Sequence, residues 1–213
     1  MKFHLPCAAA AVFLALSGSA AFAQQNAVKA GAILYQTHSR TNGISGIGVP
    51  PGADADVGNA TTLLFTYERM VTPEIGVEFV LGVPPTIKAK ATGSVAFLGN
   101  DVLSAKNIAP SLIFNYHFGA AGDTLRPYVG AGINYTKFAS IKSKLAPDVQ
   151  MGDSTGLVFQ LGADYALSKE WGLYASIAKV NVKSKLVASG TTVLTTTIDF
   201  RPITYSFGAV YRF

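Results

Sequence analysis

Cysteine is almost absent from this sequence: its single copy, Cys7, lies in an apolar run from Leu5 to Leu16. Lys2 precedes the run, and the small-residue site Ala-Phe-Ala at 21–23 follows it, which is the pattern of a secretory signal peptide. We therefore expect residues 1–23 to be a signal peptide that is cleaved from the chain. The remainder, residues 24–213, would then contain no disulfide and no lipid attached through cysteine.

Long apolar runs are also lacking after the signal, where none approaches the roughly 18 residues that a membrane-spanning helix requires. Yet 49% of the residues are hydrophobic and only 14% are charged, which excludes a disordered chain. Within hydrocarbon, only helices and closed β-barrels satisfy their backbone polar groups. If the protein is integral to a membrane, it must therefore be a barrel.

Neither charge nor histidine is concentrated anywhere in the chain. Lysine and arginine number 17 against 12 aspartates and glutamates, and the basic residues form no stripe. This distribution argues against a nucleic-acid partner and suits contact with outer-membrane lipid or lipopolysaccharide at a barrel rim. After the signal the only histidines are His38 and His117. We therefore expect that the protein is not an enzyme and that it binds no metal and no cofactor.

What the sequence does contain is residues that alternate between two faces. From Ile203 to Phe213 the odd positions are all apolar or aromatic, whereas the even positions are mostly small or polar. A period of two indicates a strand, and an apolar face with aromatic residues at both ends suits a membrane and its two interfaces. We predict that this segment is the closing strand of a transmembrane barrel.

Eight segments alternate in this way. They cover residues 28–37, 61–71, 75–83, 107–119, 126–138, 157–167, 172–185 and 202–213. The connections between them are short turns at 72–74, 120–125 and 168–170, long loops at 38–60, 84–106 and 139–155, and a hairpin near Ser189-Gly190. Short turns on one side and long connections on the other are typical of bacterial outer-membrane barrels. We predict an all-β fold, an eight-stranded antiparallel transmembrane β-barrel over residues 24–213.

Several motifs resemble the OmpW family of bacterial outer-membrane proteins. They are Arg-Pro-Tyr-Val-Gly-Ala-Gly-Ile-Asn-Tyr at 126–135, Ile-Gly-Val-Glu at 75–78, Asp-Tyr at 164–165 and the closing Tyr-Arg-Phe at 211–213. The resemblance implies a narrow lumen that binds or passes small hydrophobic molecules, with sideways release into the bilayer. It also implies that the barrel-assembly machinery recognises Phe213. The chain departs from the family at Thr155, where a tryptophan would help to close the apolar pocket.

The alternation places three bases and three acids inside the predicted barrel. They are Lys29, Arg126, Arg212, Glu68, Glu78 and Asp164. An eight-stranded barrel is just wide enough to be filled by side chains, so these groups must pair or stay hydrated. We predict a polar plug at the end with the short turns, and therefore low ionic conductance. A proton or ion path is the alternative reading of the same residues.

Apolar side chains point inward near the long loops. They are Val80, Ile113, Val158, Val180 and Val182. Such residues either pack the lumen or line a pocket for a hydrophobic substrate. Pro84, Pro85 and Pro110 lie at the same end and remove ladder donors from the wall. Our hypothesis is passive uptake: a small hydrophobic molecule enters between the loops and leaves sideways above the plug. The alternative is a structural or adhesive barrel with a packed lumen and partner-binding loops.

Overall fold

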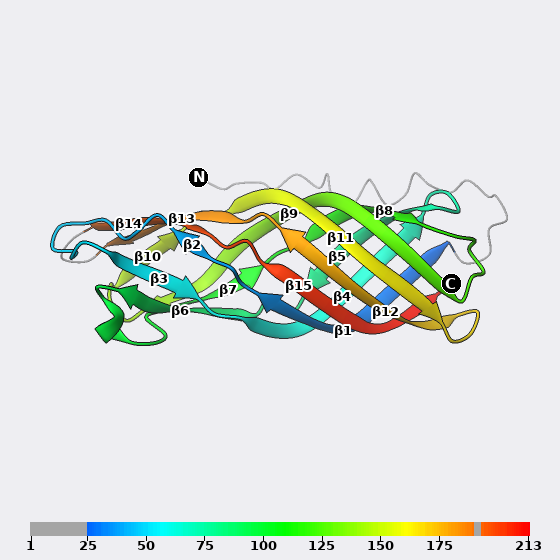
Figure 1. Cartoon of the computed structure of the whole chain (residues 1–213), viewed down its shortest axis with the longest axis horizontal. Coiled ribbons are helices and arrows are strands. Elements are labelled where there is room, and N and C mark those ends of the chain that lie inside the picture. The colour runs from blue at the N-terminus through cyan, green and yellow to red at the C-terminus, as the bar shows by residue number, and fades with distance from the viewer. Residues whose placement is uncertain (1–24, 190–192) are drawn as a thin grey trace, which may run out of the picture.

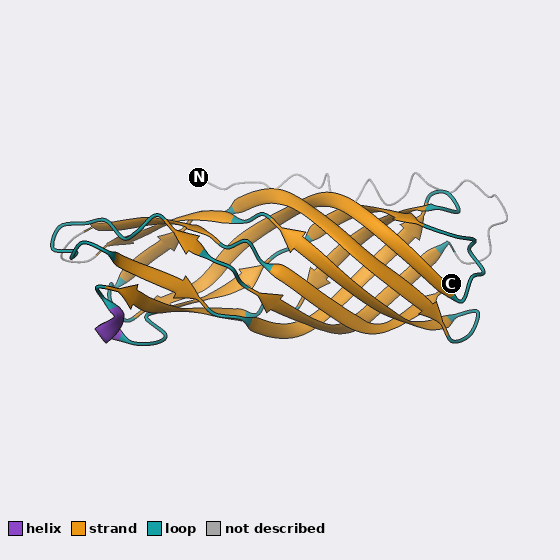
Figure 2. Cartoon of the chain, viewed as in Figure 1, coloured by secondary structure: helices purple, strands orange, loops and turns teal. Residues whose placement is uncertain are grey.

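The computed structural model describes residues 25–189 and 193–213, most of which lie in antiparallel strands (Figures 1 and 2). The expected signal peptide and Gly190 of the expected hairpin lie outside the described residues. No helix in the described part of the chain is long and apolar enough to cross a membrane. The strands form two parts, which share the long strand β9 and lie end to end (Figure 1).

The first part is a closed eight-stranded antiparallel barrel, as the sequence predicts. Its strands are β1 (Asn26–Gln36), β4 (Ala60–Met70), β5 (Ile75–Gly82), β8 (Ser111–His117), β9 (Leu125–Ser143), β11 (Ser154–Ala166), β12 (Trp171–Val180) and β15 (Ile203–Arg212). Neighbours in the chain pair in turn around the barrel, and β15 pairs with both β12 and β1. The prediction that the C-terminal segment closes the barrel is therefore confirmed.

The seam between the first and last strands is tight. Their register runs without a break from Ala27 opposite Arg212 to Gln36 opposite Ile203. At its centre Gly31 faces Gly208, and a Cβ on Gly31 would stand 2.1 Å from the carbonyl oxygen of Phe207. Only glycine permits this backbone approach, so the pair lets the closing strand lie close against the first.

The alternation sends large apolar residues outward. On β8 the burial pattern switches at every residue, and Phe114 on the outer face is 57% exposed. On the closing strand Phe207 is 56% exposed, and the rings of Trp171 and Tyr211 pack at a tilt, with centroids 4.9 Å apart, near the end with the short turns. This apolar band with aromatic residues at its edge is the surface that an outer-membrane barrel presents to lipid.

The second part of the fold is here called the extension. The prediction of loops at 38–60, 84–106 and 139–155 is wrong for much of their length, because strands form there. Its remaining elements are β2 (Arg40–Thr41), β3 (Ala53–Val57), β6 (Thr86–Gly93), the short helix η3 (Ala96–Leu98), β7 (Leu103–Ile108), β10 (Asp148–Met151), β13 (Lys183–Ser189) and β14 (Val193–Asp199). Strands β3, β6 and β7 continue the barrel sheet from β9, while β10, β13, β14 and β2 form a second sheet.

Two predicted strands are wrong in length because each joins one barrel strand to one strand of the extension. The segment 107–119 is interrupted at Ala109-Pro110, where proline lacks the N–H that a ladder requires. The segment 172–185 is interrupted after Val180, because β13 leaves the barrel and pairs with β14. Inward and outward positions keep alternating across the break after Val180, so periodicity alone does not reveal that break.

A packed apolar core fills the extension. Ten buried residues form it, with Phe138 and Phe200 stacked at a centroid distance of 5.3 Å. The space left between Val57, Ile198 and their neighbours is only about 10 Å³. The route between the loops that the sequence suggests is therefore occupied by side chains in this structure. Any molecule that enters there must displace them.

Candidate functional site

The ammonium group of Lys29 lies at the centre of a buried cluster of charges in the barrel. Its Nζ atom is 3.1 Å from Oε2 of Glu68, 3.6 Å from Oε1 of Glu78 and 3.6 Å from Oδ1 of Asp164. The four side chains come from β1, β4, β5 and β11, and each residue is at most 5% exposed. Four strands of the barrel are thus linked across its lumen by one lysine.

Neutral polar groups complete this cluster. Asn115 donates from Nδ2 to Glu68 at 2.8 Å and to Glu78 at 2.9 Å. Gln160 donates from Nε2 to Glu78 at 2.8 Å, and Nε2 of His117 is 2.7 Å from Oε1 of Glu68. Buried carboxylates are stable only when hydrogen bonds and opposite charges replace their hydration, and these groups supply both. We call Lys29, Glu68, Glu78, Asp164, Asn115, His117 and Gln160 the lumen cluster.

Aromatic rings and glycines shape the space around the cluster. The ring centroid of Tyr128 is 4.6 Å from Nζ of Lys29, and that of Tyr174 is 5.7 Å away. A Cβ on Gly162 would stand 2.3 Å from the ring of Tyr128, and a Cβ on Gly130 would stand 2.2 Å from Oδ1 of Asn115. The inward glycines therefore provide the room that these side chains occupy.

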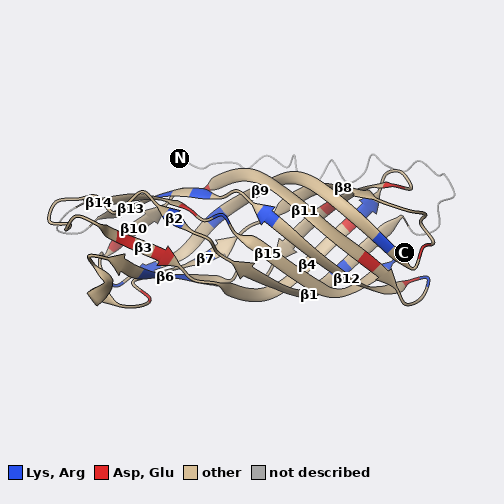
Figure 3. Ribbon diagram, in the orientation of Figure 1, with Lys and Arg blue, Asp and Glu red and all other residues tan. Residues whose placement is uncertain are grey.

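The two arginines of the predicted plug lie at the edge of the cluster. Nη2 of Arg212 is 3.6 Å from Oδ2 of Asp164, whereas Arg126 donates to the backbone carbonyl of Pro73 in a turn. Both border an open vestibule of about 660 Å³ at the end of the barrel with the short turns. Figure 3 shows acidic and basic positions together at this end, where the C-terminus lies. Five of the six predicted residues are thus linked by ion pairs, and Arg126 is turned aside.

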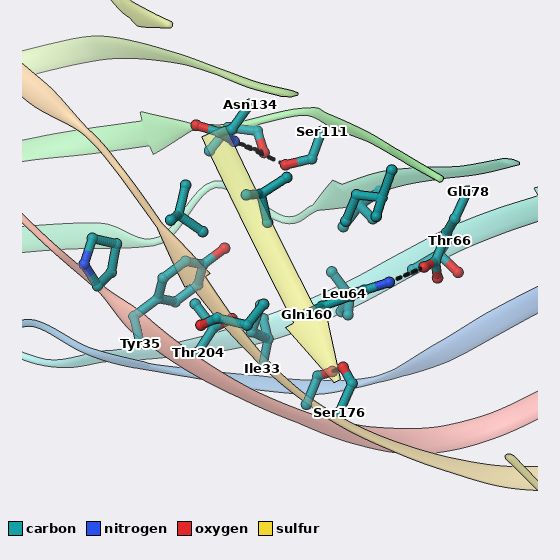
Figure 4. A pocket seen from close by; sticks show the side chains of 18 of the residues that line it. Ile33, Tyr35, Leu64, Thr66, Glu78, Ser111, Asn134, Gln160, Ser176 and Thr204 are labelled. Atoms are coloured by element: carbon teal, nitrogen blue, oxygen red, sulfur yellow. Dashed lines mark hydrogen bonds between the residues drawn. The ribbon is translucent and has the colours of Figure 1, made fainter. Parts of the chain in front are cut away.

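A smaller cavity of about 70 Å³ lies on the other side of the cluster (Figure 4). All five residues predicted to bind substrate line it: Val80, Ile113, Val158, Val180 and Val182. Ile113 and Val158 pack with Ala178 as a buried apolar group, and Val182 also belongs to the core of the extension. Figure 4 places Glu78 and Thr66 together on one side of this space and Asn134 with Ser111 on another.

Polar side chains also line this cavity, and the sequence reading gave them no role there. Asn134 donates from Nδ2 to Oγ of Ser111 at 2.9 Å, and Thr136 donates to Oδ1 of Asn134 at 2.7 Å. By contrast, Oγ1 of Thr66 and Oη of Tyr174 are buried and have no hydrogen-bond partner among the described residues. The inward alternation of β4 and β12 is the signal that identifies both as lumen residues.

The barrel wall is incomplete beside this cavity. Pairing between β5 and β8 stops at Val80 opposite Ser111. Among the described residues, the next backbone hydrogen bond across this seam runs from the amide of Asn107 to the carbonyl of Pro85, at 3.0 Å. The carbonyl of Pro110 accepts instead from the amide of Tyr135 and, at 3.2 Å, from Nδ2 of Asn134. Val80, Asn107, Ala109 and Ser111 all line the cavity, so the break in the wall adjoins it.

Thr155 does not belong to this site. It pairs with Tyr135 on the outer face of β11, is exposed, and does not line the cavity. Position 155 therefore does not border the cavity that a tryptophan there was expected to help close. The side chain at position 155 points outward, because inward positions on β11 are those of Ser154, Gly156 and Val158.

Comparison with known proteins gives consistent matches along the chain. The family model of the OmpW family matches residues 25–213. Outer membrane protein W of Escherichia coli is 32% identical over 98% of this chain and 99% of its own length. The dibenzothiophene metabolism operon protein PahQ of Pseudomonas aeruginosa is 26% identical over 63% of this chain and 62% of its own. The crystal structure of OprG from Pseudomonas aeruginosa superposes with a TM-score of 0.80 at 25% identity, covering 90% of this chain and 96% of that one.

Proposed function

Because this chain belongs to the OmpW family of bacterial outer-membrane proteins, we propose that it takes up small hydrophobic molecules passively across the outer membrane. The observation that carries the proposal is the apolar side of the lumen cavity. Val80, Ile113 and Val158 line this side, whereas the interior of an outer-membrane barrel is usually polar. One relative, PahQ, is named for dibenzothiophene metabolism, which concerns an apolar aromatic compound.

Sideways release is the second part of the proposal. The cavity borders the gap between Val80 and Pro85 on one edge and between Asn107 and Ser111 on the other. Backbone hydrogen bonds are what hold neighbouring strands together in lipid, so an unpaired stretch opens at the lowest cost. A molecule in the cavity would therefore leave through this seam into the bilayer.

The lumen cluster supports this route because it blocks the other path, along the lumen to the vestibule. Its ion pairs link Lys29 to Glu68, Glu78 and Asp164 across the width of the barrel. An apolar molecule that continued toward the vestibule would have to separate buried charges, which costs several kcal/mol for each unpaired ion. We propose that the cluster is a polar plug, with Arg126 and Arg212 at its vestibule side, and that it excludes ions as well.

Filling the cavity tests the uptake function. Ala178→Phe places a ring in the lumen, because Ala178 faces inward and is 9% exposed. Its matched control is Ala175→Phe, three residues earlier on the exposed outer face of β12. We expect the first variant to slow the initial rate of uptake of a radiolabelled hydrophobic compound by cells at least several-fold, and the second to leave it unchanged. Equal rates in both variants would contradict the proposal.

An adhesive role is the second candidate, and the tip of the extension favours it. Ile47 is 84% exposed and Phe97 is 81% exposed, so both apolar side chains are accessible to a partner. The double variant Ile47→Ser with Phe97→Ser separates the two functions. Loss of cell attachment with normal uptake would support adhesion, whereas normal attachment would count against it.

A further inference from the structure

The end of the lumen cavity next to the lumen cluster, here called the floor, carries two hydroxyl groups that find no hydrogen-bond partner in the described part of the chain. Thr66 is 7% exposed and Tyr174 is 4% exposed, and neither Oγ1 nor Oη is satisfied among the described residues. The hydroxyls of Ser176 and Ser206 line the same cavity but bond to each other at 2.7 Å. A buried hydroxyl without a partner is destabilising, so a bound molecule with a polar atom at the floor would stabilise both groups.

The cavity has a polar floor and an apolar wall. Thr66 lies opposite Lys29 in the register of β1 and β4, and the ring of Tyr174 is 5.7 Å from Nζ of Lys29. Both residues therefore lie next to Lys29 of the lumen cluster. Ile113, Val158 and Ala178 form the apolar wall. A molecule with one polar end and one apolar end would match both regions.

We propose that the cavity binds small amphipathic molecules, each with an apolar body and a single uncharged hydroxyl or carbonyl group that Thr66 and Tyr174 hold at the floor. This inference rests on the proposed uptake function and specifies its substrate class. Each hydroxyl can donate and accept, so the pair accommodates an alcohol as well as a ketone or aldehyde. A pure hydrocarbon leaves both hydroxyls unpaired, and a site built to bond a polar group discriminates against analogues that lack it.

The charges below the floor explain why the polar end is uncharged. Glu68, Glu78 and Asp164 surround Lys29, so the one nearby ammonium group is already shared by three carboxylates. A carboxylate at the floor would add a fourth negative charge to this buried group. A cationic head would lose its hydration and compete with Lys29 for the same acids. Both kinds of charge are therefore disfavoured there.

The size of the cavity limits the part of the molecule that it holds. A bound water needs about 10–15 Å³ of such space, so about 70 Å³ holds a polar group and a few carbon atoms. The rest of a longer chain would extend toward Asn107 and Ala109, where the wall is unpaired. The polar end would thus stay at the floor while the apolar end reaches the seam first.

Uptake of three compounds with equal chain length and different polar ends provides the test. Initial uptake of radiolabelled 1-octanol, n-octane and octanoate is measured in cells that produce the full-length protein or lack it. The double variant Thr66→Val with Tyr174→Phe removes two oxygen atoms and keeps the shape of both side chains. Its matched control, Thr155→Val with Tyr205→Phe, removes two hydroxyls from exposed side chains.

We expect the lumen variant to lower protein-dependent uptake of 1-octanol about 3- to 10-fold relative to n-octane, and the control to leave the ratio unchanged. Protein-dependent uptake of octanoate should be at least 10-fold slower than that of 1-octanol. An unchanged ratio in the lumen variant, or octanoate uptake equal to that of 1-octanol, would overturn the inference while leaving hydrophobic uptake intact. If no compound enters faster than in cells lacking the protein, the proposed function itself fails. Heat-dependent migration on gels checks that each barrel folds, and the single variant Tyr174→Phe replaces the double one if it does not.

Discussion

Nζ of Lys29 lies 3.1 Å from Oε2 of Glu68, and the two side chains are 0% and 2% exposed. Because the pair is buried, removing the lysine leaves its acids uncompensated. We expect Lys29→Met to lower the free energy of unfolding by about 3–5 kcal/mol, measured by denaturant titration in detergent micelles. Lys88→Met is the control: Lys88 is 2.9 Å from Asp101, but these side chains are 57% and 45% exposed, so its cost is about 0–1 kcal/mol. Equal losses in the two variants would show that the buried cluster has no special weight.

The inward glycines give a second prediction about the same cluster. In Gly130→Ala the new Cβ would stand 2.2 Å from Oδ1 of Asn115 and 2.9 Å from the side chain of Ile113. Overpacking of this kind costs about 1–3 kcal/mol, and here it also separates Asn115 from the carboxylates. Gly122→Ala in a turn meets nothing within 4 Å and should be neutral. Thermal unfolding of the two variants in micelles measures the difference, and a stable Gly130→Ala barrel would contradict this account of the lumen.

Conductance measures whether the lumen cluster closes the barrel. The wild-type protein should give no porin-sized current steps in planar bilayers, because charged and polar side chains span the lumen. Replacing Lys29, Glu78 and Gln160 together by alanine removes the groups that meet at its centre and should produce discrete conducting events. Replacing the exposed Lys88, Lys90 and Asp101 by alanine is the matched control. Large steps from the wild-type protein would rule out a plug.

Much of this architecture follows from the sequence because a barrel strand exposes one face to lipid and the other to the lumen. That constraint gives the eight strands, the closing role of Ile203–Arg212 and the inward direction of Lys29, Glu68 and Asp164. It fails where the chain leaves the membrane. The strands of the extension alternate with the same period, so nothing in the pattern marks where β12 ends and β13 begins.

The lumen shows a similar limit. Alternation identifies which side chains face inward, but it does not give their heights along neighbouring strands. The register does place Arg126 opposite Asp164, as their charges suggest, but the guanidinium group of Arg126 donates to the carbonyl of Pro73 in a turn. The sequence does not single out the hydroxyls of Thr66 and Tyr174 for a related reason. Their lack of hydrogen-bond partners among the described residues is known only from the structure.

Locking the wall tests sideways release. The chain has no cysteine after Cys7, so Gly82→Cys with Ala109→Cys introduces one pair of thiols across the unpaired seam. A short cleavable bis-thiol reagent that joins them should slow protein-dependent uptake of a hydrophobic compound at least several-fold, and reduction should restore it. The same reagent on Ala163→Cys with Ala175→Cys joins residues that are already paired on β11 and β12, so uptake should not change. Uptake that is unaffected by the first cross-link would exclude this seam as the exit.

The extension makes the last prediction, since its core stands between the loops and the cavity. Phe200 is 5% exposed and stacks on Phe138 at 5.3 Å, and both belong to the apolar core that also contains Val182. Phe200→Ala removes a ring from this core, a change that costs about 3–5 kcal/mol where the structure cannot collapse around the space. Because Phe138 lies beyond the part of β9 that pairs with β8 and β11, we expect the extension to loosen while the barrel stays folded. Limited proteolysis should then cleave within β13 or β14 but not within β1 or β15.

If the core of the extension also obstructs access to the cavity, cells that produce Phe200→Ala should take up hydrophobic compounds faster than cells that produce the wild type. The substitution Phe97→Ala, at an exposed position of η3, should change neither cleavage nor uptake. Slower uptake by Phe200→Ala would instead mean that the ordered extension guides molecules inward.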